Sequence, residues 1–227
     1  MKILVLGGGG REHALCWKLQ QSPRVEAVYA LPGSDGMAAG GVTCLPGDPC
    51  AAGEVLRAVY AQGVNLVVVG PEAPLAAGIA DALRDKGVAV FGPSRAAAQL
   101  ESSKIFAKEF MARHHIPTAR FVAATGAVEA RRALAAFGAP VVIKADGLAA
   151  GKGVVVPDTP EAADQALEQM LAGELVGAAG ERVVIEERLS GPEVSLLAIS
   201  SGEDYLLLSA ARDHKRLLDG DRGPNTG

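Results

Sequence analysis

The sequence predicts an α/β protein whose first hundred or so residues form a parallel sheet with crossover helices. Short β-branched segments alternate with helical segments, and glycine-rich loops follow several of the expected strands. The chain of 227 residues is 49% hydrophobic but only 4% aromatic. A core of small aliphatic side chains is typical of α/β folds with closely packed helices.

The first part of the chain alternates regularly between the two kinds of element. Strands are expected at 2–6, 25–30, 64–69 and 88–91, and helices at 11–21, 49–62 and 74–86. Asp48 and Pro49 suit the N-cap and first turn of the second helix, and Gly63 and Gly87 suit positions just after helices. This βαβ alternation predicts parallel pairing of the strands.

The pattern changes after Pro93. A helix is expected at 102–114, followed by a compact α+β unit and then a β-hairpin. The α+β unit would contain a strand at 119–123, a helix at 126–137, a lysine-bearing hairpin at 141–156, a helix at 160–172 and a strand at 182–188. The later hairpin would pair 193–200 with 204–211, and the charged residues 213–227 are expected to form neither helix nor strand.

Composition excludes several functional classes. The net charge of −4 and a pI near 5.6 argue against a nucleic-acid-binding surface. The three cysteines, Cys16, Cys44 and Cys50, contain no C-x-x-C pair and indicate neither a disulfide framework nor a zinc site. A reduced, cytoplasmic setting is expected, and no apolar run reaches the roughly 18 residues of a membrane span.

The most informative segment is VVIKADGLAAGKGVVV at 141–156, in which Lys144 and Lys152 can both face an anion. Its glycines are Gly147, Gly151 and Gly153. Glycines let backbone N–H groups approach phosphate closely, so a nucleotide triphosphate is the predicted ligand. The spacing does not match a P-loop, which also requires a following helix. A flexible hairpin with a solvated lysine is the alternative, although an unpaired ammonium among the apolar neighbours of Lys144 would be costly.

A second glycine loop, GGGGREHA at 7–14, follows the first strand and opens a helix, which favours an anion. It does not match the dinucleotide fingerprint, because Glu12 takes the third glycine position and the second strand ends without an acidic residue. Arg11 suits a phosphate monoester, or it is simply solvated.

A third loop, GPEAPLAAG at 70–78, follows another parallel strand. It would lie at the carboxyl edge of the sheet, where open α/β sheets bind ligands. Glu72 could meet an amine or a sugar hydroxyl there, or it could only begin a helix.

Six motifs occur in a fixed order: GGGGREHA, GPEAPL, SSKIFAKEF, VVIKADGLAAGKGVVV, VVIEERLSGPEVS and DHKRLLDGDRGPNTG. With them the chain resembles the glycinamide ribonucleotide synthetase family, the phosphoribosylamine–glycine ligases, over essentially its whole length. The resemblance implies an ATP-grasp fold with a pre-ATP-grasp, Rossmann-like domain at 1–101. An incomplete ATP-grasp core would comprise 102–118 and 189–227, and an α+β lid 119–188.

The resemblance also implies roles for individual residues. ATP would be bound by Lys104, Lys144, Gly147, Gly151, Lys152, Gly153, Glu186, Glu187, Leu189 and Glu193. The ribosyl substrate and the reacting groups would lie near Gly9, Gly10, Arg11, Glu72, Asn225 and Thr226. Asp213, His214, Lys215 and Arg216 would face the reacting centre, where Lys215 or Arg216 could steady the transferred phosphoryl charge.

The implied reaction is ATP-dependent ligation of glycine to 5-phosphoribosylamine through glycyl phosphate, giving glycinamide ribonucleotide in purine biosynthesis. Mg²⁺ or Mn²⁺ would assist, with ligands expected beyond residue 227. We therefore expect an N-terminal fragment that does not catalyse the ligation alone. The alternatives are another ATP-grasp carboxylate–amine ligase or biotin-dependent carboxylase, against which GGGGREHA and DHKR argue, and a non-catalytic nucleotide-binding or assembly module.

Overall fold

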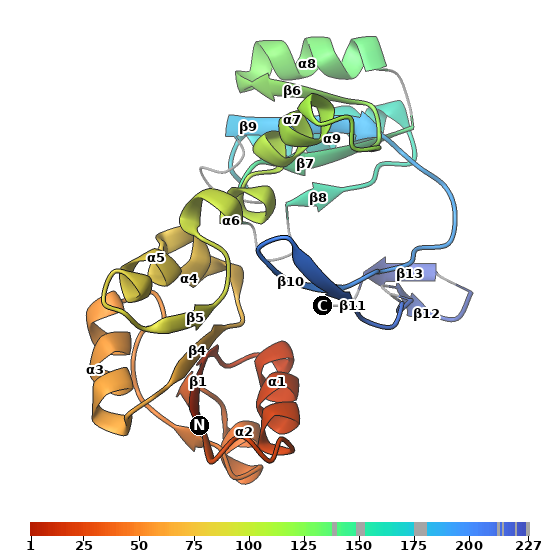
Figure 1. The fold of residues 1–227 in the computed structure, drawn as a ribbon. Helices are drawn as coiled ribbons and strands as arrows, with labels where there is room; N and C mark the ends of the chain where they lie inside the picture. The colour runs from red at the N-terminus through yellow and green to blue at the C-terminus, as the bar shows by residue number, and fades with distance from the viewer. Residues whose placement is uncertain are drawn as a thin grey trace.

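The computed structural model describes residues 1–137, 140–148, 153–174, 181–212, 214, 216–220 and 222–225, with only the backbone at 216, 224 and 225. In these residues the chain forms a parallel sheet with its helices, an antiparallel sheet with its helices, and two hairpins (Figure 1). The predicted α/β class is confirmed. No helix within the described ranges is long and apolar enough to cross a membrane.

The first sheet has five strands in the order β3-β2-β1-β4-β5, and all of its pairings are parallel. The strands are β1 (Lys2–Gly7), β2 (Ala27–Pro32), β3 (Thr43–Cys44), β4 (Leu66–Val69) and β5 (Ala89–Phe91). The chain leaves β1 toward β2 on one side and later returns to β4 on the other. The loops after β1 and β4 therefore meet at the topological switch point, where such sheets bind ligands.

Both faces of this sheet are covered, and the side chains of β1 alternate between two cores. Ile3 and Val5 pack with Cys16 of α1 (Gly10–Gln20) and Met37 of α2 (Asp35–Ala39). The opposite core, formed with α3 (Ala52–Gln62) and α5 (Ile79–Arg84), contains Leu4, Leu6, Val55, Val59, Ile79 and Leu83. Burial on both faces explains why β1 reads as a continuous apolar run.

Two helix boundaries in this part differ from the prediction. Helix α3 does not begin at Asp48, whose carboxylate instead accepts the Cys50 N–H at 2.8 Å and whose carbonyl accepts the Ala51 N–H at 3.0 Å. The expected helix at 74–86 is two helices, α4 (Glu72–Ala77) and α5. They are separated by Gly78, whose φ of +90° suits glycine and ends the first helix.

The chain passes to the second sheet through two helices where one was expected. These are α6 (Arg95–Ser102) and α7 (Lys104–Arg113); in Figure 1, α6 lies between the two sheets and α7 overlaps the strands of the second sheet. Ser103 separates them with extended backbone, φ −135° and ψ 113°, and its hydroxyl accepts the Phe106 N–H at 3.1 Å. Ser103 is therefore the N-cap of α7. Helix α2 and strand β3 were not predicted.

The second sheet is antiparallel, with the strand order β6-β9-β7-β8. Its strands are β6 (Phe121–Thr125), β7 (Val141–Ala145), β8 (Val154–Val155) and β9 (Arg182–Glu187), and α8 (Gly126–Phe137) and α9 (Pro160–Leu171) pack on one face. Val141, Ile143 and Ala145 point into that core. Since side chains alternate along a strand, Lys144 lies on the other face.

Two hairpins follow the second sheet. β10 (Ala198–Ser201) pairs with β11 (Asp204–Leu207), as predicted. β12 (Arg216–Leu218) pairs with β13 (Arg222–Asn225), so the expectation of neither helix nor strand at the end of the chain was wrong. Charged and turn-forming residues obscured these strands, and Gly220, with φ +73°, provides the turn between them.

Candidate functional site

Three charged side chains meet on the face of the second sheet away from α8 and α9. Glu186, 4% exposed, pairs through its carboxylate with the ammonium groups of Lys108 on α7 and Lys144 on β7. Lys108 also donates to the Thr118 hydroxyl at 2.7 Å and the Ala119 carbonyl at 3.4 Å. Buried charges persist when they are paired in this way. Two cations share one carboxylate, so this lysine cluster is positively charged overall.

Lys104, the first residue of α7, brings a third ammonium group near the cluster. Its Nζ donates to the Gly147 carbonyl at 2.8 Å. Burial lowers the pKa of Lys104 below its ordinary value, and repulsion from Lys144 lowers it further, although Asp146 and Glu101 partly offset these effects. A polyanion near Lys104 and Lys144 would stabilise both charges. The geometry therefore suits phosphate groups.

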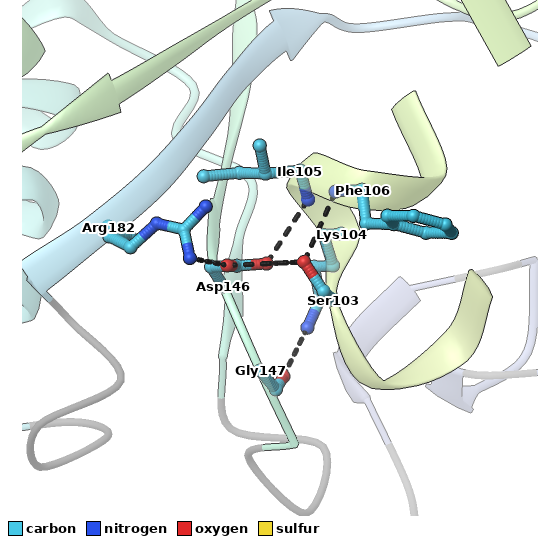
Figure 2. Close-up of polar contacts among 7 residues, drawn as sticks. All are labelled: Ser103, Lys104, Ile105, Phe106, Asp146, Gly147 and Arg182. Atoms are coloured by element: carbon cyan, nitrogen blue, oxygen red, sulfur yellow. Dashed lines mark hydrogen bonds and ion pairs between the residues drawn. The ribbon is translucent and has the colours of Figure 1, made fainter. Parts of the chain in front are cut away.

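The start of the predicted phosphate loop is held by a buried aspartate that the sequence reasoning did not select (Figure 2). The Asp146 carboxylate accepts the Ser103 hydroxyl at 3.0 Å and the Ile105 N–H at 3.1 Å, and it lies 3.3 Å from the Arg182 guanidinium. The available signal was its place two residues after Lys144 and directly before the loop glycine Gly147.

The remaining loop residues are only partly described. Gly147 has φ +102°, a conformation that other residues rarely adopt. The Gly153 carbonyl accepts the Ala145 N–H at 2.8 Å and so joins the two ends of the loop. Gly151 and Lys152 lie outside the described residues.

The residues expected around adenosine are not all brought together. Glu186 belongs to the lysine cluster, whereas both carboxylate oxygens of Glu187 accept bonds of 2.9 Å from the N–H and Nε of Arg120. These bonds, chiefly that from the Arg120 backbone, lower the pKa of Glu187. Leu189 is 70% exposed, and Glu193 is also exposed. The two adjacent glutamates thus have different environments.

At the switch point of the first sheet, the side chains of Arg11 and Glu72 contact each other. The Arg11 guanidinium donates to the Glu72 carboxylate at 2.8 Å and to the Gly70 carbonyl at 3.0 Å. This bond lowers the pKa of Glu72 and raises that of Arg11. The side chains are 61% and 38% exposed, so both remain accessible to a substrate.

Glu12 explains why this loop departs from a dinucleotide-binding loop. Its buried carboxylate accepts the Gly9 N–H at 2.8 Å. Glu12, in the first turn of α1, thereby caps the N-terminus of its own helix. The Glu12 side chain also fills the space beside Gly70, where an added Cβ would lie 2.3 Å from its Cγ. The Gly9 amide is thus engaged within the protein, and Gly10 begins the helix.

The last motif is described in part. Arg216 and Asn225 are register partners in the β12–β13 hairpin, and His214 is exposed. Asp213, Lys215 and Thr226 lie outside the described residues. Among the residues with assigned positions, no three His, Cys, Asp or Glu side chains gather as a metal site would require. The expectation that the metal ligands follow residue 227 remains a prediction.

Known protein families and relatives match this chain over its whole length. The family model for the phosphoribosylglycinamide synthetase N domain matches residues 1–101, and that for the ATP-grasp (A) domain of the same synthetase matches 102–227. Phosphoribosylamine–glycine ligases from Ralstonia nicotianae and Pseudomonas aeruginosa are 56% and 49% identical, each over all of this chain. The chain spans about half the length of these relatives, 54% and 53% respectively.

Solved structures agree with this match. The crystal structure of phosphoribosylamine–glycine ligase from Thermotoga maritima is 37% identical, with a TM-score of 0.83, over 100% of this chain and 54% of its own. N5-carboxyaminoimidazole synthetase from Staphylococcus aureus complexed with ADP, 16% identical, shares the fold with a TM-score of 0.70 over 95% and 55% of the two chains. The resemblance stated from the motifs is confirmed: the chain belongs to the phosphoribosylglycinamide synthetase family.

Proposed function

We propose that the protein carrying this chain uses ATP to ligate glycine to 5-phosphoribosylamine, giving glycinamide ribonucleotide, ADP and phosphate. The structural observation that carries this proposal is the position of Lys104 on α7, whose ammonium donates to the carbonyl of Gly147, three residues after Lys144 on β7. Two cations from separate elements suit a polyphosphate better than a single charge would. The relative 56% identical over the full chain is named for this ligase activity.

In this proposal Lys104 and Lys144 hold the ATP phosphates, with the glycines from Gly147 to Gly153 around them. Glu186 orients Lys144, and the segment from Glu187 through Leu189 to Glu193 receives adenosine. Residues 119–188 act as the lid of an ATP-grasp core formed by 102–118 and 189–227. The lid would also exclude water from the reacting groups, because an acyl phosphate is readily hydrolysed.

The second substrate is assigned to the switch point in domain 1–101. Arg11 would bind the phosphate of 5-phosphoribosylamine bidentately, and Glu72 would face its amine or a ribose hydroxyl. Gly10, at the start of α1, adds the positive end of the helix dipole. The pairing of Arg11 with Glu72 supports this arrangement, because it holds both side chains at the carboxyl edge of β1 and β4.

The chemistry has two steps. A carboxylate oxygen of glycine attacks the γ-phosphorus of ATP, the bond to the β–γ bridging oxygen breaks, and ADP leaves. The amine nitrogen of phosphoribosylamine then attacks the glycyl carbonyl carbon, loses a proton and displaces phosphate. Lys104 and Lys144 would offset the repulsion between the glycine carboxylate and the triphosphate. Lys215 or Arg216 would steady the transferred phosphoryl group.

A divalent cation, Mg²⁺ or Mn²⁺, would further neutralise the triphosphate when bound. The described residues do not bring together three side chains suited to it, so none of the steps above is assigned to the metal.

The proposal is tested in two stages. Calorimetric titration of the chain with ADP should show saturable binding. The protein that carries the chain should then release ADP only when glycine and phosphoribosylamine are both supplied, with alanine in place of glycine as the control. ADP release that does not depend on glycine, or that needs another carboxylate, would contradict the proposed substrates while leaving nucleotide binding intact.

A further inference from the structure

Asp146 is a buried charged group with no role in the chemistry above. It is 8% exposed, and its carboxylate is bound from three sides, by the Ser103 hydroxyl, the Ile105 N–H and the Arg182 guanidinium (Figure 2). A buried carboxylate that has lost its hydration is stable only with such bonds. The contacts with Ser103 and Ile105 tie the end of β7 to the first turn of α7.

The sequence neighbours of these residues are the proposed phosphate ligands. Lys104 lies between Ser103 and Ile105, and Gly147 directly follows Asp146. The Lys104 ammonium spans the same junction, because it donates to the Gly147 carbonyl at 2.8 Å. The start of α7 and the start of the glycine loop are thus held together by Asp146 and separately by Lys104.

We propose that Asp146 is a positioning residue: it fixes the first turn of α7 against the end of β7, so that Lys104 can exchange the Gly147 carbonyl for a nucleotide phosphate without the junction moving. This inference rests on the proposed function, because it assumes that Lys104 meets the nucleotide. Asp146 does not contact the nucleotide in this proposal; it holds Ser103 and thereby positions Lys104. Side-chain ordering before binding improves affinity, because less freedom is lost on binding.

The charges around Lys104 predict how loss of Asp146 would change the pH dependence of nucleotide binding. Asp146 at the end of β7 and Glu101 on α6 favour its protonated form, whereas Lys144 on β7 disfavours it. Arg182 on β9 faces Asp146 rather than Lys104. Removing the Asp146 charge should therefore lower the pKa of Lys104 further and shift the alkaline loss of nucleotide affinity to lower pH.

The experiment is calorimetric titration with ADP of the chain and of variants at the junction. Asp146→Asn retains an acceptor oxygen but loses the charge, and its amide NH₂ would face donors. We expect its Kd for ADP to rise about tenfold. Ser103→Ala should raise the Kd several-fold, and Ser103→Thr, which keeps the hydroxyl, should restore it.

Ser94→Ala is the matched control. Ser94 is the N-cap of α6, where its hydroxyl accepts the Ala97 N–H at 3.2 Å, so this variant also loses a serine cap. Its Kd for ADP should stay within about twofold of the wild-type value, since capping alone affects helix stability. Repeating the titrations at rising pH should show an earlier loss of affinity for Asp146→Asn but not for Ser94→Ala.

Four outcomes would overturn the proposal, the last of them together with the proposed function. If Ser103→Ala and Ser94→Ala change the Kd for ADP equally, Ser103 acts only as a helix cap and not in positioning Lys104. If the pH dependence of the Kd is the same in Asp146→Asn as in the wild type, Asp146 does not influence Lys104. If Asp146→Asn does not fold, the comparison of Ser103→Ala with Ser103→Thr decides, because failure of Ser103→Thr to restore affinity contradicts a hydroxyl contact. A wild-type chain that binds no ADP would instead overturn the proposed function, and this inference with it.

Discussion

The ammonium group of Lys144 pairs with the buried carboxylate of Glu186, and Lys108 pairs with the second oxygen of the same carboxylate. The two lysines differ in access, since the Lys108 side chain is 10% exposed and that of Lys144 is 28% exposed. Lys144 can therefore turn toward a ligand while Lys108 continues to compensate Glu186. A carboxylate left without either partner would carry a large desolvation cost.

Replacing Lys108 should destabilise the protein more than removal of an ordinary lysine. Lys108→Met keeps most of the side-chain volume but removes a buried charge, and we expect the free energy of unfolding to fall by about 2–4 kcal/mol. Denaturant titration measures it. Lys86→Met, at an exposed lysine, is the control and should change stability by less than about 0.5 kcal/mol. Equal effects of the two substitutions would contradict the assigned cluster.

Nucleotide affinity should fall as the pH rises through the alkaline range. The pKa of Lys104 lies below the ordinary value of 10.5, so its protonated form is lost at a lower pH than that of a free lysine. The protonated form binds phosphate, and above about pH 8 phosphate groups are fully ionised, so the affinity follows Lys104. Calorimetric Kd values across pH 8 to about 10.5 measure this effect, and Lys104→Arg should flatten the curve because arginine stays charged. An equally steep curve in Lys104→Arg would exclude Lys104 as the titrating group.

Arg11→Ala should selectively weaken binding of the ribosyl substrate. We expect KM for phosphoribosylamine to rise roughly tenfold or more through loss of charge-assisted bonds, with little change in the Kd for ADP. Its stability should change by less than about 1 kcal/mol, because the pair with Glu72 is exposed. Arg57→Ala, which removes another exposed arginine paired with Glu54, should leave both constants unchanged. An unaltered KM for phosphoribosylamine in Arg11→Ala would show that Arg11 does not bind this substrate.

Gly70 should not tolerate a side chain. An added Cβ would lie 2.3 Å from Glu12 Cγ and 2.4 Å from its Oε1, so Gly70→Ala must displace the buried cap of α1. We expect a loss of about 1–3 kcal/mol in the free energy of unfolding. At Gly53 the nearest atom would be 4.0 Å away, so Gly53→Ala in α3 should be neutral or stabilising. Comparable losses in both variants would contradict this packing.

Local patterns predicted most of the fold and the position of Lys144. The alternation along β7 places Lys144 opposite Val141, Ile143 and Ala145, and the strand order of the first sheet brings Arg11 and Glu72 together. Both follow from strand geometry and from the rules for parallel sheets.

Contacts distant in sequence were not predictable in the same way. The segment 95–113 contains no glycine or proline to mark the end of α6, and the Ser103 hydroxyl at that point donates to Asp146, 43 residues away. Likewise, alternation places Glu186 and Glu187 on opposite faces but does not reveal that Lys108 and Arg120 are their partners. Glu12 takes the place of a glycine in the dinucleotide-binding fingerprint, and only the structure shows that its carboxylate accepts the Gly9 N–H.

The central claim is that Lys144 and Lys104 bind the phosphates of a nucleotide. Calorimetric titration of Lys144→Ala with ADP tests it most directly, with Lys18→Ala on the exposed side of α1 as the control. We expect a loss of about 1.5–3 kcal/mol of binding free energy, roughly a tenfold to hundredfold rise in Kd, for Lys144→Ala only. An unchanged Kd in Lys144→Ala would contradict the account.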